Sequence, residues 1–176
     1  MGLDKRVDLR QAGMVLLISL VFLLLLSLVG LSSMQGAVSQ QKIAGSFWHR
    51  NQSLQSAESG LRLGETALRR AGGAWPTCTS LVTCAPPGEA SSVTGAGLHP
   101  VSAVTWVAMT GGLYAIQSLG PAVGLVHLPP ETPAMLYRVT AVGLSGQSRT
   151  VLEVVYARVG EGSGARFQRV LWRQLY

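Results

Sequence analysis

Two cysteines, Cys78 and Cys84, are the residues of this sequence whose side chains could most readily react with one another. They lie close together in a segment rich in proline, glycine and serine, so they form either a disulfide or a pair of free thiols. Their spacing differs from the CxxC motif of redox enzymes, and no neighbouring histidine or cysteine completes a zinc site. In an oxidising compartment we expect a disulfide, which would shape a short loop and add about 2 kcal/mol of stability.

The three histidines do not form a catalytic pattern. They are far apart in the sequence and in unlike surroundings, at His49, His99 and His127. No GxSxG, HExxH or Walker A motif and no paired carboxylates accompany them. We therefore predict a protein that is not an enzyme and that binds no metal and no cofactor. The net charge of +6 comes from scattered arginines without interleaved aromatic residues, so no nucleic-acid partner is expected.

An uncharged segment near the N-terminus limits the function more strongly. Residues 11–41 contain no charged side chain. The 21 residues Met14–Met34 would span about 31 Å as a helix, which matches the hydrocarbon core of a bilayer. Lys5, Arg6 and Arg10 precede this segment. Basic residues on this side predict that the N-terminus stays in the cytoplasm and that the rest of the chain crosses the membrane.

The helical pattern continues beyond the apolar segment. Apolar residues recur at helical spacing at Ile43, Phe47, Leu54, Ala57, Leu61, Leu68 and Ala71. Two glycines at residues 72–73 and then Pro76 predict the end of the helix. The sequence thus predicts one long helix, whose first part suits lipid and whose second part is amphipathic and packs on a globular domain.

The last part of the chain changes to the alternating pattern of β-strands. Strand-like segments are Val101–Met109, Leu113–Leu119, Ala134–Val142, Thr150–Val159 and Phe167–Leu175. We predict the α+β class, with a long N-terminal helix packed on an antiparallel sheet of about four strands. The expected segments are a leader (1–13), a transmembrane helix (14–34), an amphipathic helix (35–72), a connector with the cysteine pair (73–100) and the sheet domain (101–176).

The N-terminal region resembles a known family. The leader ending in Gly13, the segment MVLLISLVFLLLLSLVGLSSM and the continuation KIAGSFWHRNQSLQSAESGLRLGE are similar to the N-terminal region of the PilX-type minor pilins of type IV pili. The resemblance implies a class III prepilin leader, cleavage by a prepilin peptidase between Gly13 and Met14, and N-methylation of the new terminus at Met14. A glycine before the cut suits the close approach of a protease, because it has no side chain to clear.

One position departs from the pattern of the major pilins. Those subunits carry a glutamate within the first turn after the cut, where it meets the terminal amine of a neighbouring subunit. The fifth residue counted from Met14 is Ile18. A subunit at the tip of a filament has no neighbour above it and needs no such charge. The resemblance therefore implies an assembly contact at Ile18 and a role in the initiation or tip complex, which supports pilus-dependent motility and adhesion.

The resemblance also implies partners and a location. The expected partners are other minor pilins, the major pilin, the prepilin peptidase, the inner-membrane assembly machinery and membrane lipid. The protein is expected in the inner membrane with its C-terminal domain in the periplasm, and then in the extracellular pilus. Two alternatives stay open: a membrane-anchored periplasmic binding domain or enzyme unrelated to pili, and a secreted protein whose signal peptide is cut near Ser33–Ala37. The N-terminus of the mature chain distinguishes them.

Overall fold

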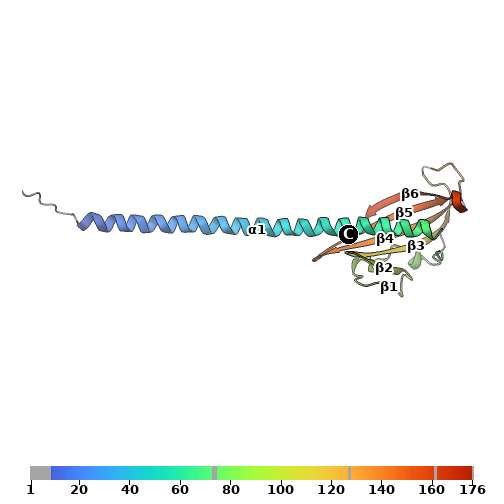
Figure 1. The fold of residues 1–176 in the computed structure, drawn as a ribbon, viewed down its shortest axis with the longest axis horizontal. Coiled ribbons are helices and arrows are strands. Elements are labelled where there is room, and N and C mark those ends of the chain that lie inside the picture. Colours follow the sequence, from blue (N-terminus) through green and yellow to red (C-terminus); the bar gives the residue numbers. More distant parts are fainter. Residues whose placement is uncertain (1–8, 73–74, 127, 161, 176) are drawn as a thin grey trace, which may run out of the picture. The chain divides into compact units, whose positions relative to one another are not determined.

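The computed structural model describes residues 9–72, 75–126, 128–160 and 162–175. The chain divides into two compact units, Met1–Gly45 and Ser46–Tyr176. Helix α1 (Leu9–Arg70) contributes residues to both units (Figure 1). The predicted α+β class is confirmed, with a long N-terminal helix and an antiparallel sheet.

The described residues of the first unit all belong to the N-terminal, largely apolar part of α1. Its large side chains, from Met14 to Val38, are exposed around the whole circumference of the helix. The described residues contain one helix that is long and apolar enough to cross a membrane, and this is α1. Side chains that are apolar on every side of a helix suit a lipid environment better than the surface of a water-soluble domain.

The second unit is built on a six-stranded antiparallel sheet, in which strands that follow one another in the chain also lie next to one another. The strands are β1 (Gly97–Leu98), β2 (Thr105–Met109), β3 (Gly112–Ala122), β4 (Ala134–Ser145), β5 (Ser148–Val159) and β6 (Arg166–Gln174). Two-residue turns join β2 to β3 and β4 to β5, and they contain Gly111 and Gly146 at φ of +76° and +55°. Glycine adopts this left-handed conformation without strain, which favours tight hairpins.

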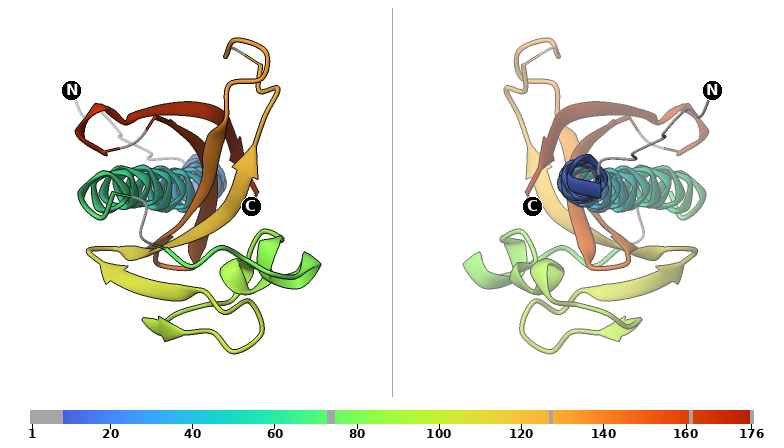
Figure 2. Two further views of the ribbon diagram at one scale, coloured as in Figure 1. Left: turned by 90° about the vertical axis from the view of Figure 1, so that its right-hand side faces the viewer. Right: turned by 90° about the vertical axis from the view of Figure 1, so that its left-hand side faces the viewer.

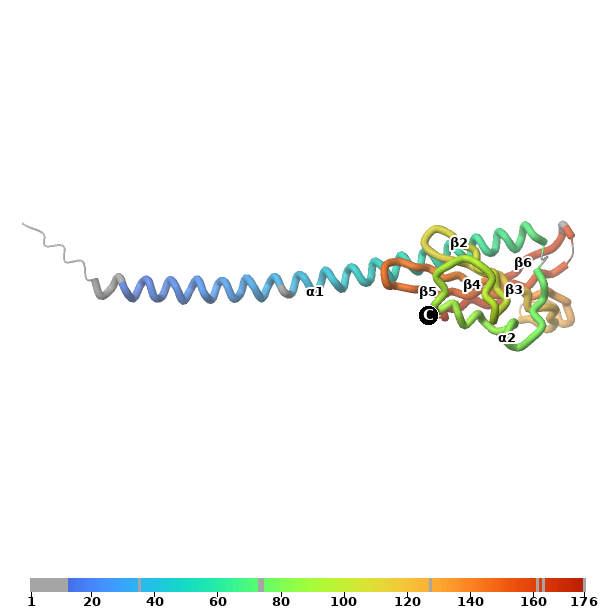
Figure 3. The backbone as a smooth tube through the Cα atoms, turned by 90° about the horizontal axis from the view of Figure 1, so that it is seen from below, coloured from blue at the N-terminus to red at the C-terminus, as the bar shows by residue number. Residues whose placement is uncertain are grey.

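The sheet has more strands than the about four predicted, and its first strands differ from the prediction. The alternating pattern predicts a strand over Val101–Met109, but β2 begins only at Thr105. Ala103 has a φ of 54°, so the chain turns before β2. The expected irregular connector contains β1 and two short helices, α2 (Leu81–Cys84) and η1 (Gly88–Ser91), while η2 (Gly162–Gly164) precedes β6. Figure 3 shows α2 beside the sheet.

The C-terminal part of α1 packs very closely on one face of the sheet, which curves around it (Figure 2). A side chain on Gly143 of β4 would overlap the Ser53 carbonyl and come within 2.6 Å of the Ala57 nitrogen. A side chain on Gly60 or Gly64 would press on Met109 or Val139. Glycines on both surfaces therefore bring the two backbones together. The core on this face comprises Ala57, Leu61, Leu68, Tyr137, Val139, Ala141, Leu152, Val154 and Tyr156.

The predicted apolar stripe of the helix is buried only in part. Leu54, Ala57, Leu61 and Leu68 pack on the sheet, whereas Phe47 is exposed. The opposite face of the sheet has a second core, formed by Ala90, Val104, Trp106, Leu113, Ala115, Val142 and Val151. Because both faces of the sheet are covered, consecutive side chains in the middle of β4 and β5 are buried, whichever face they point to.

Candidate functional site: the start of the apolar helix and the disulfide loop

Gly13 and Met14, the expected cleavage site, are exposed residues of α1. A Cβ atom on Gly13 would meet nothing within 4 Å, so packing within the described chain does not require glycine there. Ile18 is 58% exposed and Met14 is 67% exposed. Residues 1–8 of the expected leader lie outside the described residues. Cleavage, methylation and the assembly contact at Ile18 therefore stay predictions.

The cysteine pair forms a disulfide between Cys78 and Cys84, with Cα atoms 5.2 Å apart. The segment between them, here called the disulfide loop (residues 78–84), contains helix α2. Ser80 caps this helix, because its hydroxyl accepts from the Thr83 N–H at 3.1 Å. The Thr83 hydroxyl in turn accepts from the Ser80 N–H at 3.0 Å. The capping and the disulfide together hold a loop that presents Leu81, 93% exposed, at its surface.

Side chains of the sheet bind the far end of the disulfide loop. Gln117 of β3 donates through Nε2 to the carbonyls of Thr83 at 2.8 Å and Ala85 at 3.2 Å. Arg138 of β4 donates through Nη1 to the Cys84 carbonyl at 2.8 Å and to Gln117 Oε1 at 3.2 Å. Carbonyls at the end of a helix lack partners within the helix, so these side chains satisfy groups that would otherwise need water.

Arg138 also belongs to a buried ionic cluster. Its Nε lies 3.1 Å from Oε2 of Glu153, whose side chain is completely buried. Arg173 of β6 approaches the other carboxylate oxygen, with Nη2 at 2.9 Å and Nε donating at 3.0 Å. Burial lowers the pKa of Arg138, and the nearby Arg173 charge adds to this, while Glu153 opposes it. Charged side chains of β4, β5 and β6 thus link these three neighbouring strands, and Arg138 connects them to the disulfide loop.

The sequence interpretation missed this cluster. Arg138 and Glu153 each stand alone among apolar residues in an alternating strand, a position that usually faces water in a sheet with one covered face. The useful signal was the oppositely charged pair in two strands joined by one short turn. A second signal was the number of residues in the connector, which is long enough to cover the second face of the sheet.

The histidines lie at separate places in the described structure. His49 Nδ1 is 3.0 Å from the Ser145 hydroxyl, and its ring lies against Gly146. His99 Nδ1 is 3.5 Å from Glu89 Oε1, and His127 lies outside the described residues. Burial raises the pKa of Glu89, but hydrogen bonds from Ser102, its own backbone and Trp106 outweigh burial, so the pKa lies below its ordinary value. Among the described side chains, no three His, Cys, Asp or Glu are grouped to hold a metal.

Comparison with known proteins gives one match. Residues 12–62 match the family model described as PilX N-terminal. This segment includes Gly13, Met14 and Ile18 and ends within the part of α1 that packs on the sheet. No curated protein and no solved structure matches the chain.

Proposed function

From the match of residues 12–62 to the PilX N-terminal family model, we propose that the chain is a PilX-type minor pilin of type IV pili and that it acts in the complex that initiates or caps the filament. The observation that carries this proposal is Ile18, an apolar residue where a shaft subunit carries a carboxylate. Through this complex the protein would support pilus-dependent motility and adhesion. A pilin of this kind has a structural rather than a chemical task.

Maturation at Gly13 is the first step of the proposal. The prepilin peptidase would cut between Gly13 and Met14, and Met14 would then be N-methylated. Two features support this site: the side-chain space around Gly13 is open, and the apolar part of the helix begins immediately after it. After the cut the apolar helix would stay in the inner membrane as an anchor, with the second unit in the periplasm. An oxidising periplasm agrees with the Cys78–Cys84 disulfide.

The tip position follows from the energetics of a buried charge. A carboxylate among packed apolar helices is destabilising unless it finds a partner. In the shaft, the terminal amine of the next subunit supplies that partner. Ile18 needs none, so this chain can be the subunit above which no other lies, while its own amine at Met14 can serve the subunit below. Its partners would be other minor pilins, the major pilin and the inner-membrane assembly machinery.

Subunit stoichiometry tests this proposal. Deleting the gene should sharply reduce surface pili while the major pilin stays in the membrane pool, and the wild-type gene should restore them. Quantitative mass spectrometry of sheared filaments should then find the chain at a small fraction of the major pilin. The Ile18→Glu variant should enter the shaft more often than the matched Ile18→Val variant. An abundance near that of the major pilin in the wild type would contradict the tip position.

The alternative function, a membrane-anchored periplasmic binding domain or enzyme unrelated to pili, predicts different results. In that case the deletion strain would keep its pili, and sheared filaments would contain none of the chain. The mature N-terminus would also be Met1 rather than methylated Met14. Intact-mass analysis of the membrane fraction separates these outcomes.

A further inference from the structure

Strands β2 and β3 separate from one another after only three paired positions. The pairs are Met109 with Gly112, Ala108 with Leu113 and Val107 with Tyr114. In a continued ladder Thr105 would be the partner of Ile116, but β2 instead follows β1 through the pairs of Trp106 with Gly97 and Thr105 with Leu98. A gap therefore opens beside Ile116.

The backbone N–H and C=O groups of Ile116 point into this gap. The Cys78 N–H donates to the Ser118 carbonyl at 2.9 Å, on the side of β3 away from β4. Alternate residues of an antiparallel strand turn their N–H and C=O to the same side, so those of Ile116 share the direction of Ser118. In the described part of the chain no strand pairs with Ile116 on this side. Its donor and acceptor are available to water or to a ligand.

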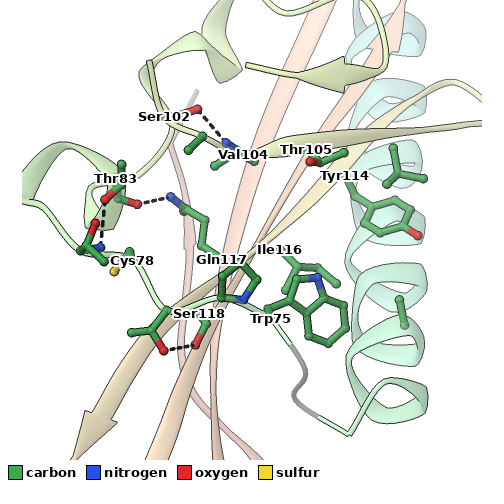
Figure 4. A pocket seen from close by; sticks show the side chains of 16 residues that line it. Trp75, Cys78, Thr83, Ser102, Val104, Thr105, Tyr114, Ile116, Gln117 and Ser118 are labelled. Carbon is green, nitrogen blue, oxygen red and sulfur yellow. Dashed lines mark hydrogen bonds between the residues drawn. The ribbon is translucent and has the colours of Figure 1, made fainter. Parts of the chain in front are cut away.

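A cavity of about 410 Å³ occupies the gap (Figure 4). Two aromatic side chains, Trp75 and Tyr114, and several neutral polar groups line it, among them Thr77, Thr105, Gln117 and Ser118. None of its lining residues that the structure describes is charged, although the chain carries a net charge of +6. A charged ligand would lose its hydration there without gaining a counter-charge. The volume lies in the range typical of small-molecule sites.

The part of the β3 edge that has no partner strand is short, and its length favours a compact ligand over a peptide. The pair of Val107 with Tyr114 closes the gap at one end, and the bridge of Thr77 with Ser118 closes it at the other. Only Ile116 remains open between them. A peptide that adds to a sheet needs a row of backbone groups, whereas a compact ligand can be held by the one donor and the one acceptor of Ile116.

We propose that this cavity binds an uncharged sugar carrying an acetamido group, as in N-acetylglucosamine. The acetamido carbonyl would accept from the Ile116 N–H, and a hydroxyl of the sugar would donate to the Ile116 C=O. Aromatic rings offer apolar faces to the C–H groups of a sugar ring, and threonine, serine and glutamine side chains bind its hydroxyls. This inference does not depend on where the subunit lies in a filament.

Binding is tested with the full chain in detergent micelles, by calorimetry and by the intrinsic fluorescence of tryptophan. The probe is triacetylchitotriose, and the matched probe is cellotriose, a neutral trimer without acetamido groups. We expect saturable binding of triacetylchitotriose and about tenfold weaker binding of cellotriose, because only the first carries an acetamido carbonyl that can accept from the Ile116 N–H. Equal affinity for the two sugars, or no saturable binding of either, would overturn the proposal.

Two variants locate the binding in the cavity. Thr105→Arg places a charge in the gap from an exposed position, so the fold should persist while the affinity falls at least about tenfold. Trp75→Ala should lower the affinity to a similar extent, and Trp172→Ala, on the exposed side of β6, should not change it. If Trp75→Ala does not fold because it packs against the core, Thr105→Arg decides alone. Unchanged affinity in Thr105→Arg, or binding of an extended peptide in place of the sugar, would overturn the proposal.

The sugar could come from bacterial peptidoglycan or from glycans outside the cell. Sedimentation of the full chain with isolated peptidoglycan sacculi and, in parallel, with chitin beads distinguishes the two. Sedimentation with either material that is lost in Thr105→Arg supports the proposal and identifies the source. Failure to sediment with both contradicts it.

Discussion

The Tyr156 hydroxyl of β5 donates a hydrogen bond of 2.9 Å to Oε2 of Glu65 in helix α1. The other carboxylate oxygen accepts from Arg69 Nη2 at 2.8 Å. Burial acts to raise the pKa of Glu65, but the hydrogen bonds from Arg69 and Tyr156 outweigh it, so the pKa lies below its ordinary value. Burial and the Glu65 carboxylate raise the pKa of Tyr156, which therefore remains protonated as the donor. One carboxylate thus joins the end of the helix to the sheet.

This junction predicts an acid-sensitive stability. The folded pKa of Glu65 is depressed below the ordinary 4.5, so its charge stabilises the fold above pH 4.5 and the contribution is lost as the pH falls through the folded pKa. Thermal unfolding from pH 7 to pH 3 should therefore show a smaller acid-induced decrease in Tm for Glu65→Gln than for the wild type. The control is Glu58→Gln, an exposed glutamate of the same helix. Equal pH dependence in both variants would disprove the role of Glu65.

Because the helix and the sheet approach so closely, we predict that even one added methyl group between them strongly lowers the stability of the fold. In Gly143→Ala the added methyl group would overlap the Ser53 carbonyl, and backbone atoms cannot move aside as a side chain can. We expect a loss of about 3 kcal/mol or more in the free energy of unfolding. Gly88→Ala, where a Cβ meets nothing within 4 Å, should change stability by less than about 1 kcal/mol. Urea denaturation of the two variants measures the difference.

The buried ionic cluster predicts unequal effects of substituting Glu153 and Arg173. Glu153→Leu leaves Arg138 buried without its counter-charge and should cost about 3–5 kcal/mol. Arg173→Ala removes a side chain that is 45% exposed and leaves Arg138 beside Glu153, but it takes the donor from Oε1 of the buried carboxylate, so it should cost about 1–3 kcal/mol. Comparable losses in the two variants, measured by urea denaturation, would show that the pair is not coupled as described.

The cleavage site predicts a defect in maturation rather than in folding. Gly13→Val should leave a full-length, membrane-bound precursor, because the side chain would obstruct the peptidase while nothing within the described chain contacts this position. Intact-mass analysis should find the leader retained in Gly13→Val and a methylated Met14 terminus in the wild type. The matched variant Gly45→Ala lies in the same helix, has the same open surroundings and should mature normally. Normal maturation of Gly13→Val would remove the main support for the cleavage site.

The sequence predicted those features that depend on local pattern. The long uncharged segment and the helical spacing after it indicated α1, and the alternation in Ala134–Val142 and Thr150–Val159 indicated β4 and β5. The cysteine spacing allowed the disulfide that the structure contains. Each of these depends on residues close together in the chain.

Features that depend on what covers a surface could not be predicted in this way. Gly60 and Gly64 are unfavourable in an isolated helix, and only the presence of Met109 and Val139 shows why they are suitable there. Arg138 has the alternating position of a water-facing residue, and the carbonyl of Cys84, distant in sequence, makes it a buried one. The strand expected at Val101 was wrong because Ala103 adopts a left-handed turn, for which its residue type gives no signal.

The order of the elements along the chain has a consequence during synthesis. Ala57, Leu61 and Leu68 are made first, but the residues that cover them lie in β4 and β5, as far along the chain as Tyr156. Each hairpin of the sheet can form from neighbouring segments, whereas the helix must wait for nearly the whole chain before its apolar stripe is covered. Until then the stripe is open to proteases and to association with other chains. A nascent chain that stops before β5 should therefore be degraded, however well its N-terminal helix has formed.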